Sequence, residues 1–238
     1  MINRWTALPV LGAVATFAFC AQFARADEVK AETAQVTISL PAPALTGDVS
    51  VEEALQGRRS VRSYAAEPVT LRQVSQLLWA AQGITEPTQG LRTAPSAQRT
   101  YPLRVYLFAG NVTDLPDGVY LYVPLGHKLE LVMSGDQRTS VGGQPQMTKA
   151  PAVFSYIADY SVTGEKYGER ARVFAAIEAG HSAQNVLLEE VALGLVGVPM
   201  GGIDAAKMKA LLKLADNQEP MYAVSVGKKA AAGSGAAR

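Results

Sequence analysis

The stretch from Glu169 to Leu195, ERARVFAAIEAGHSAQNVLLEEVALGL, organises the whole chain. Its apolar and small residues recur at helical steps, so they fall on neighbouring faces of one helix. They are Val173, Phe174, Ile177, Gly180, Leu187, Leu188, Val191 and Leu195, with His181 and Gln184 among them. So broad an apolar surface predicts a long, central, buried helix.

Shorter segments on both sides carry their own signatures. Ser50 with Glu53, and Thr70 with Gln73, form capping boxes that predict helices ending near Gly57 and Gly83. A further short helix is expected after Asp204, a competent N-cap. Alternating or β-branched runs predict strands at 103–107, 119–123, 129–132, 151–157 and 221–226. Early helices, central strands and a long helix before the last strand predict an α+β domain without βαβα alternation.

Composition excludes several broad classes of protein. The chain has 238 residues, of which 48% are hydrophobic and 18% charged, as expected for one globular domain with a sizeable core. Lys and Arg total 22 against 21 Asp and Glu, a formal net charge of +1. There is thus no global attraction for nucleic acid or anionic membranes, and any anion site is local.

The N-terminus has the pattern of a signal peptide. An apolar run from Trp5 to Phe23 is followed by Ala24-Arg25-Ala26, an A-x-A cleavage site, which predicts export to the periplasm or the medium. An uncleaved membrane anchor and a lipoprotein attached at Cys20 are the alternatives. Cleavage after Ala26 would leave no cysteine, so no disulfide or thiolate chemistry is expected.

These features divide the chain into four parts. Residues 1–26 are the predicted signal peptide, and 27–49, with Pro41 and Pro43, an extended arm able to wrap a partner subunit. Residues 50–229 form the folded domain, and 230–238 a disordered tail.

A cluster of arginines follows the first expected helix. Arg58, Arg59, Ser60 and Arg62 bring guanidinium groups and a hydroxyl to a place where the chain changes direction. Guanidinium forks match phosphate oxygens, and in an extended segment Arg58, Ser60 and Arg62 point the same way. The segment is a candidate phosphate site; a solvated basic turn is the alternative.

Three further segments could line a ligand. Pro95, Ser96 and Ala97 form a small-residue loop that a flat ring can approach, or an ordinary Pro-Ser turn. The loop of Pro199, Met200, Gly201 and Gly202 exposes backbone N–H groups, or simply follows the long helix. Lys228 and Lys229 could complete a phosphate site, or form a solubilising tail.

In order and content, these segments resemble the nitroreductase-like flavoproteins over about Ser50 to Lys229. The resemblance implies a mostly antiparallel central sheet flanked by helices, in an entwined homodimer with FMN at its interface. It also implies that Arg58, Ser60, Arg62 and one of Lys228 or Lys229 hold the FMN phosphate end. Pro95–Ala97 would then lie against the isoalloxazine ring, with backbone N–H groups of Pro199–Gly202 facing flavin N5.

Other stretches are similar to the SagB-type dehydrogenase branch of that family, notably Leu77–Ile84 and Glu178-x-Gly180-His181-x-x-Gln184-Asn185. That branch implies Lys166 and Tyr167 as substrate-side acid/base residues; a solvated helix start is the alternative. His181 has no partner at metal-ligand spacing, so a packed core histidine, and no metal, is expected. Arg99 and Thr100 depart from the family, which has Asn and Gln after the Pro-Ser loop.

The expected function is an exported FMN-dependent oxidoreductase. It would move two electrons through flavin N5 to or from a small organic substrate, a nitroaromatic, quinone or azoline. Export removes the chain from NAD(P)H, so the electron donor is left open. The alternatives are a catalytically silent flavin-binding protein of the same fold, acting as sensor or maturation partner, and a phosphate-binding module without flavin.

Overall fold

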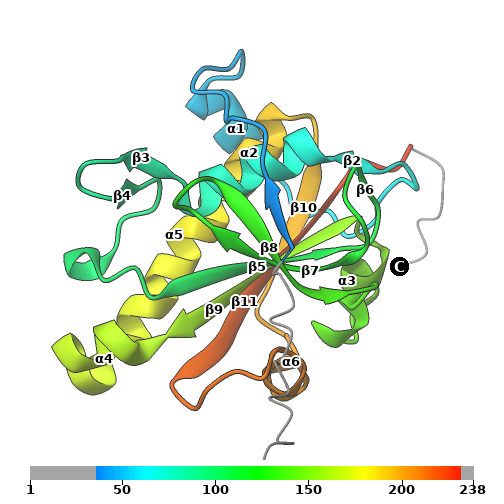
Figure 1. The fold of residues 1–238 in the computed structure, drawn as a ribbon. Helices are drawn as coiled ribbons and strands as arrows, with labels where there is room; N and C mark the ends of the chain where they lie inside the picture. Colours follow the sequence, from blue (N-terminus) through cyan, green and yellow to red (C-terminus); the bar gives the residue numbers. More distant parts are fainter. Residues whose placement is uncertain (1–35, 232–238) are drawn as a thin grey trace, which may run out of the picture. The chain divides into compact units, whose positions relative to one another are not determined.

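The computed structural model describes residues 36–231, which are built around a seven-stranded antiparallel sheet (Figure 1). The strand order is β1-β8-β7-β5-β9-β11-β10, so β1 and β10 are its edges. The strands are β1 Thr37–Ser39, β5 Leu103–Ala109, β7 Gly118–Val123, β8 Lys128–Ser134, β9 Ala152–Asp159, β10 Val196–Met200 and β11 Gln218–Gly227. Two small ribbons pair β2 Val69–Thr70 with β6 Val112–Thr113, and β3 Ile84–Glu86 with β4 Leu91–Arg92.

Helices cover both faces of this sheet. They are α1 Val51–Gly57, α2 Leu71–Gln82, α3 Pro145–Lys149, α4 Tyr160–Tyr167, α5 Ala171–Ala192 and α6 Ala205–Leu212, with 3-10 turns η1 Ala97–Arg99, η2 Arg138–Ser140 and η3 Gly168–Arg170. Successive residues of β5 face opposite sides: Leu107 joins the core beneath α2 and α5, whereas Phe108 joins the core beneath α3 and α6 (Figure 1). The expected α+β domain with a central antiparallel sheet is thus confirmed.

Local chemistry sets the helix ends as expected. Both capping boxes form: the side chains of Ser50 and Thr70 accept hydrogen bonds from the backbone N–H groups of Glu53 and Gln73, whose side chains accept in return. α2 ends at Gly83, where a side chain would not fit, because a Cβ there would lie 2.2 Å from the ring of Trp79.

The long helix α5 is present but not buried all round. Its buried stripe runs from Ala171 to Glu190, while Val173 is 57% and Ile177 50% exposed. His181 lies on the exposed side, so the expectation of a packed core histidine was wrong. Periodicity reveals an apolar surface but not what covers it, and in this chain part of that surface is uncovered.

Two further local expectations need correction. Residues 198–200, expected to be loop, belong to strand β10, which tolerates Pro199 because it is an edge strand. Lys166 and Tyr167 end the separate helix α4 and do not start the core helix.

The described part of the predicted arm folds onto its own chain. β1 pairs with β8, and the segment that follows contacts α2, where the Ser75 hydroxyl donates to the Pro41 carbonyl at 2.6 Å. The Ala44 backbone exchanges two hydrogen bonds with the Gln76 side chain. The His127 ring lies 3.1 Å from the Pro41 carbonyl through Nε2 and 2.9 Å from the Tyr122 hydroxyl on β7 through Nδ1, and so ties the segment to the sheet.

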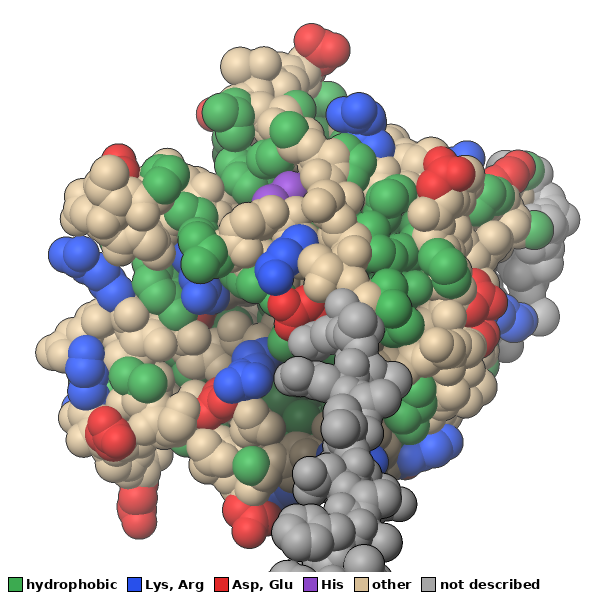
Figure 2. Space-filling model, in the orientation of Figure 1, with side chains coloured by type: hydrophobic (Ala, Val, Ile, Leu, Met, Phe, Trp, Pro, Cys, Tyr) green, Lys and Arg blue, Asp and Glu red, His purple; other side chains and the backbone are tan. Residues whose placement is uncertain are grey.

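The predicted signal peptide and residues 232–238 of the tail lie outside the described residues. Between residues 36 and 231, no helix has the length and apolar character that crossing a membrane requires. Lys, Arg, Asp and Glu side chains are interspersed over the face seen in Figure 2, in keeping with the near-neutral net charge.

Candidate functional site

The arginine segment lies along the β10 edge of the sheet. Ser60 pairs with Gly197 in a parallel bridge, and the Val61 N–H donates to the Gly197 carbonyl at 2.9 Å. Further on, the Ala65 N–H donates to the Lys228 carbonyl at 3.0 Å. The segment therefore meets both the start of β10 and the end of β11, bringing residues 58–62 and Lys228 into one region.

Tyr64 attaches this segment to strand β11. Its hydroxyl is 2.6 Å from the Ser225 hydroxyl on β11. Burial raises the pKa of Tyr64 to about 12, so the phenol stays neutral at physiological pH. The arginines are thus attached to the sheet by backbone pairing and by one buried hydroxyl contact.

The three arginines have different surroundings. Arg58 is half-buried and interacts electrostatically with Glu190 of α5. Arg59 turns back and donates to the carbonyls of Gln56 and Arg58 at the end of α1, at 2.9 and 2.7 Å, so its guanidinium caps the helix. Arg62 is exposed, as is Ser60, and Lys228 is half-buried.

Glu190 is a buried carboxyl group under this segment, which the sequence reasoning missed. It is 1% exposed, and its Oε2 atom has no hydrogen-bond partner among the described residues. Burial raises its pKa from the usual 4.5 to about 8, against the opposing effects of the Gly197 N–H and the Arg58 charge. A Cβ on Gly197 would lie 2.3 Å from Oε2, so glycine is required there.

The predicted glycine loop follows the same strand. Met200 is buried, whereas Gly201 and Gly202 are exposed beyond its end. At about 3.3 Å per residue, Gly201 lies roughly 13 Å along the strand from Gly197. β10 therefore has the arginine segment near its start and an accessible glycine backbone at its end, with the half-buried Pro199 between them.

The Pro95–Ala97 loop lies elsewhere, against α2 and the middle of α5. The carbonyl of Thr93, just before it, accepts a hydrogen bond from the Asn185 side chain at 3.3 Å. Ser96 interacts with Glu178, which is 12 positions before Glu190 and hence about 18 Å away along the α5 axis. Within one chain, the structure thus joins residues 58–62 to β10 and Lys228, but not to this loop.

Lys166 and Tyr167 form a third location, at the end of α4. Lys166 is exposed, and Tyr167 is half-buried with its ring 4.5 Å from that of Phe174 on α5.

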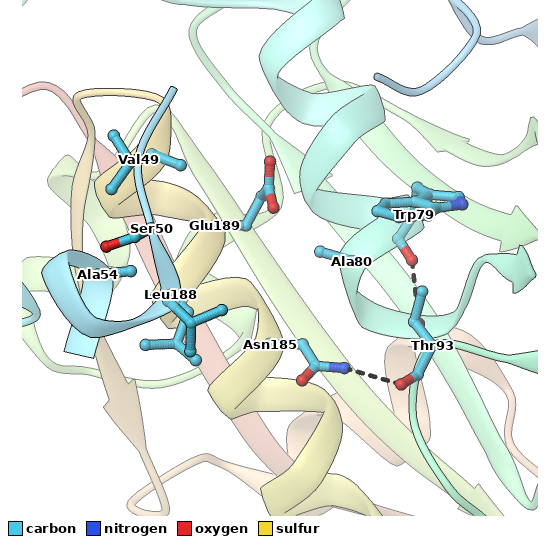
Figure 3. A pocket seen from close by; sticks show the side chains of 11 residues that line it. Val49, Ser50, Ala54, Trp79, Ala80, Thr93, Asn185, Leu188 and Glu189 are labelled. Atoms are coloured by element: carbon cyan, nitrogen blue, oxygen red, sulfur yellow. Dashed lines mark hydrogen bonds between the residues drawn. The ribbon is translucent and has the colours of Figure 1, made fainter. Parts of the chain in front are cut away.

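A cavity of about 240 Å³ lies between α1, α2 and α5 (Figure 3). Its wall includes Trp79, Thr93 and Asn185, joined by the two hydrogen bonds drawn in Figure 3. None of the sequence-predicted site residues lines it.

The sequence did contain a signal for the two buried carboxyl groups. Glu178 and Glu190 lie on the same stripe as Ala171, Ala175 and Val186, at helical spacing. An acidic residue in a buried stripe is unusual and marks a group with a shifted pKa.

Comparisons with known proteins agree with this architecture. A family model described as "Nitroreductase family" matches residues 55–228. A Methanocaldococcus jannaschii protein named as a nitroreductase is 35% identical over 186 residues, which cover 76% of this chain and 92% of that protein. The chain belongs to the nitroreductase family, a family of oxidoreductases.

Solved structures have the same fold. A Ralstonia eutropha protein, also named as a nitroreductase, has a TM-score of 0.75 and 31% identity, with 82% of this chain and 90% of that chain covered. The Escherichia coli microcin synthetase complex contains a chain with a TM-score of 0.63 and 22% identity, with 91% and 85% covered. The NADPH:FMN oxidoreductase of Vibrio harveyi has a TM-score of 0.53 and 21% identity, with 75% and 68% covered.

Proposed function

We propose that this protein is an exported FMN-dependent oxidoreductase of the SagB-type branch, acting on a small organic substrate such as a nitroaromatic, quinone or azoline. The observation that carries the proposal is the arrangement along β10, with cationic and hydroxyl groups near its start and exposed glycines beyond its end. FMN is elongated, with a phosphate at one end and a flat ring at the other. Bound FMN would supply two-electron transfer, which no side chain provides.

The donors at the two ends suit the two ends of FMN. Arg58, Arg62 and the Ser60 hydroxyl provide charge-assisted and neutral donors for phosphate oxygens, and Lys228 stands beside them. Gly201 and Gly202 offer backbone without Cβ atoms, which a ring can approach closely. Backbone N–H groups there would donate to the ring and stabilise the negative charge of its reduced form.

A homodimer would complete the site. The Pro95–Ala97 loop is separated from the arginine segment in one chain, so a second copy is the natural source of the loop that closes over the ring. Exposed apolar residues on two neighbouring helices favour such an interface: Val51 and Leu55 on α1, and Val173 and Ile177 on α5. Their exposed fractions lie between 50% and 64%.

On the substrate side, Lys166 would carry a proton to or from substrate and Tyr167 would assist it. Tyr167 is supported by its contact with Phe174, which places it next to the exposed stripe of α5. The family includes enzymes that use NAD(P)H, but an exported chain needs another reductant.

The test is FMN retention by the mature protein. The purified wild-type protein should show a flavin absorption spectrum that dithionite bleaches and air restores. Arg58→Ala/Arg62→Ala should weaken FMN binding by about tenfold to a hundredfold per lost charge-assisted bond, at roughly 1.5 to 3 kcal/mol each.

The matched control is Arg72→Ala/Lys149→Ala, which removes the same charge from two exposed sites on α2 and α3. Equal FMN affinity in the two double variants would overturn the assigned phosphate site. If FMN is bound but no reductant bleaches it, the protein is a catalytically silent flavin-binding protein and not an enzyme.

A further inference from the structure

The loop from Pro95 to Tyr101 is held in an unusual backbone conformation. Gln98, Arg99 and Tyr101 have φ angles of 47°, 57° and 44°, in the left-handed region that residues with a Cβ rarely adopt. Such conformations persist only when surrounding contacts over-determine them. The contacts that hold this loop therefore decide what surface it presents.

Tyr101 is held in place by contacts of its backbone and of its side chain. Its N–H donates to the Ser96 hydroxyl at 2.8 Å, which closes the loop on itself. Its phenol oxygen accepts a hydrogen bond from the backbone N–H of Arg92 at 3.3 Å, and the Arg92 guanidinium lies 4.4 Å from the ring centroid. The far end of the loop thus depends on both Ser96 and Arg92.

Both contacts lead to one buried carboxyl group. Arg92 Nη1 donates to Gln82 Oε1 at 2.9 Å, and Gln82 Nε2 donates to Glu178 Oε1 at 3.4 Å. The Ser96 side chain interacts directly with Glu178. Glu178 is 2% and Gln82 1% exposed, so water competes little for these contacts.

We propose that Glu178 is a positioning residue for the Pro95–Tyr101 loop, which it holds through Ser96 on one side and through Gln82 and Arg92 on the other. This inference rests on the proposed function, in which the loop faces flavin and substrate. Glu178 touches neither, and it acts on the reaction through the position of this loop.

The protonation of Glu178 then controls how firmly the loop is held. Burial raises its pKa to about 7, and the interactions with Ser96, Gln82 and Arg92 oppose that rise, because they favour the ionised carboxylate. Other titratable groups facing the network are Tyr101 and Tyr122; burial raises the pKa of Tyr122, so its phenol stays neutral. The packed structure keeps the Glu178 carboxyl protonated up to a pKa of about 7, whereas a solvated carboxyl ionises near 4.5, so ionisation as the pH rises through about 7 should loosen the loop.

Hydrogen exchange in the flavin-free protein tests this directly. Amides of residues 97–101 are followed at about pH 5.5 and about pH 8.5, corrected for intrinsic exchange rates. Wild-type protection should be roughly tenfold lower at the higher pH, because opening the loop lets water solvate the ionised carboxylate. Glu178→Gln keeps the shape but cannot ionise, so its loop protection should not change with pH.

The matched control is Glu189→Gln, a glutamate of the same helix that interacts with Gln76 and not with the loop. It should retain the wild-type pH dependence. Ser96→Ala provides a second variant that leaves the buried carboxyl in place, and it should enlarge the pH effect, because it removes an interaction that favours the ionised carboxylate. Identical pH dependence in wild type, Glu178→Gln and Ser96→Ala would overturn the positioning role.

FMN titration of the same samples separates the two proposals. If the pH dependence of loop protection is lost in Glu178→Gln but the protein binds no FMN, only the proposed function is refuted. Firm FMN binding with loop protection indifferent to Glu178→Gln would refute the positioning role alone.

Discussion

Replacing Glu190 by Gln should make the protein markedly more stable at alkaline pH. The folded protein keeps the Glu190 proton up to a pKa of about 8, whereas the unfolded chain releases it near 4.5. Between those values the folded state binds more protons than the unfolded state, so the free energy of unfolding falls as the pH rises. Glutamine retains the shape and the oxygen facing the Gly197 N–H but does not titrate.

The pKa values set the size of the effect. A shift from 4.5 to about 8, at about 1.4 kcal/mol per unit, gives a difference on the order of 5 kcal/mol, fully developed above about pH 8. Equilibrium urea unfolding of both proteins at about pH 5 and about pH 9, at one protein concentration, measures it. The effects of all other titrating groups cancel in the difference between the two proteins.

The result that would refute the reasoning is a stability difference that stays constant within about 1 kcal/mol across this range. Such constancy would mean that Glu190 ionises near its usual pKa, with water or Arg58 reaching it freely. The same experiment on Gly143→Ala provides a background variant, because a Cβ at Gly143 meets nothing within 4 Å.

Two further variants test other parts of the structure. Gly197→Ala places a Cβ 2.3 Å from Glu190 Oε2 and should therefore displace the arginine segment. The free energy of unfolding should fall by about 1 to 3 kcal/mol, as measured by thermal unfolding. Gly143→Ala, the control, should unfold as the wild type does. Ile177→Asp should convert the proposed dimer into a folded monomer by light scattering, whereas Val162→Asp, which changes a similarly exposed residue on α4, should not. A wild-type protein that is already monomeric would remove the dimer from the proposal.

Most secondary structure was predictable because it depends on local patterns. Capping boxes marked the starts of α1 and α2, and alternating residues marked β5. Helix α4 was missed because its polar sequence lacks a strong apolar period. Strand β10 was mistaken for a loop because Pro199 is acceptable only once its edge position is known.

The site was predictable as residue types but not as an arrangement. The donors at Arg58, Ser60 and Arg62 could be read from the sequence, but their position beside Gly197 arises from a long-range pairing that no local pattern encodes. The Arg59 side chain folds back because it donates to a carbonyl at the end of α1, a contact that the sequence alone does not reveal. The burial of Glu178 and Glu190 was overlooked because the helical positions counted were apolar residues with His181 and Gln184, and the glutamates were left out of the count.

The pairing of Ser60 with Gly197 also covers part of a sheet edge that could otherwise pair with another molecule. β10 is an edge strand, and an uncovered edge offers free backbone groups to a strand of another molecule. The segment that carries the arginines occupies part of that edge. Variants that loosen it should therefore show self-association during expression and storage, and a ligand that fixes it should suppress that tendency.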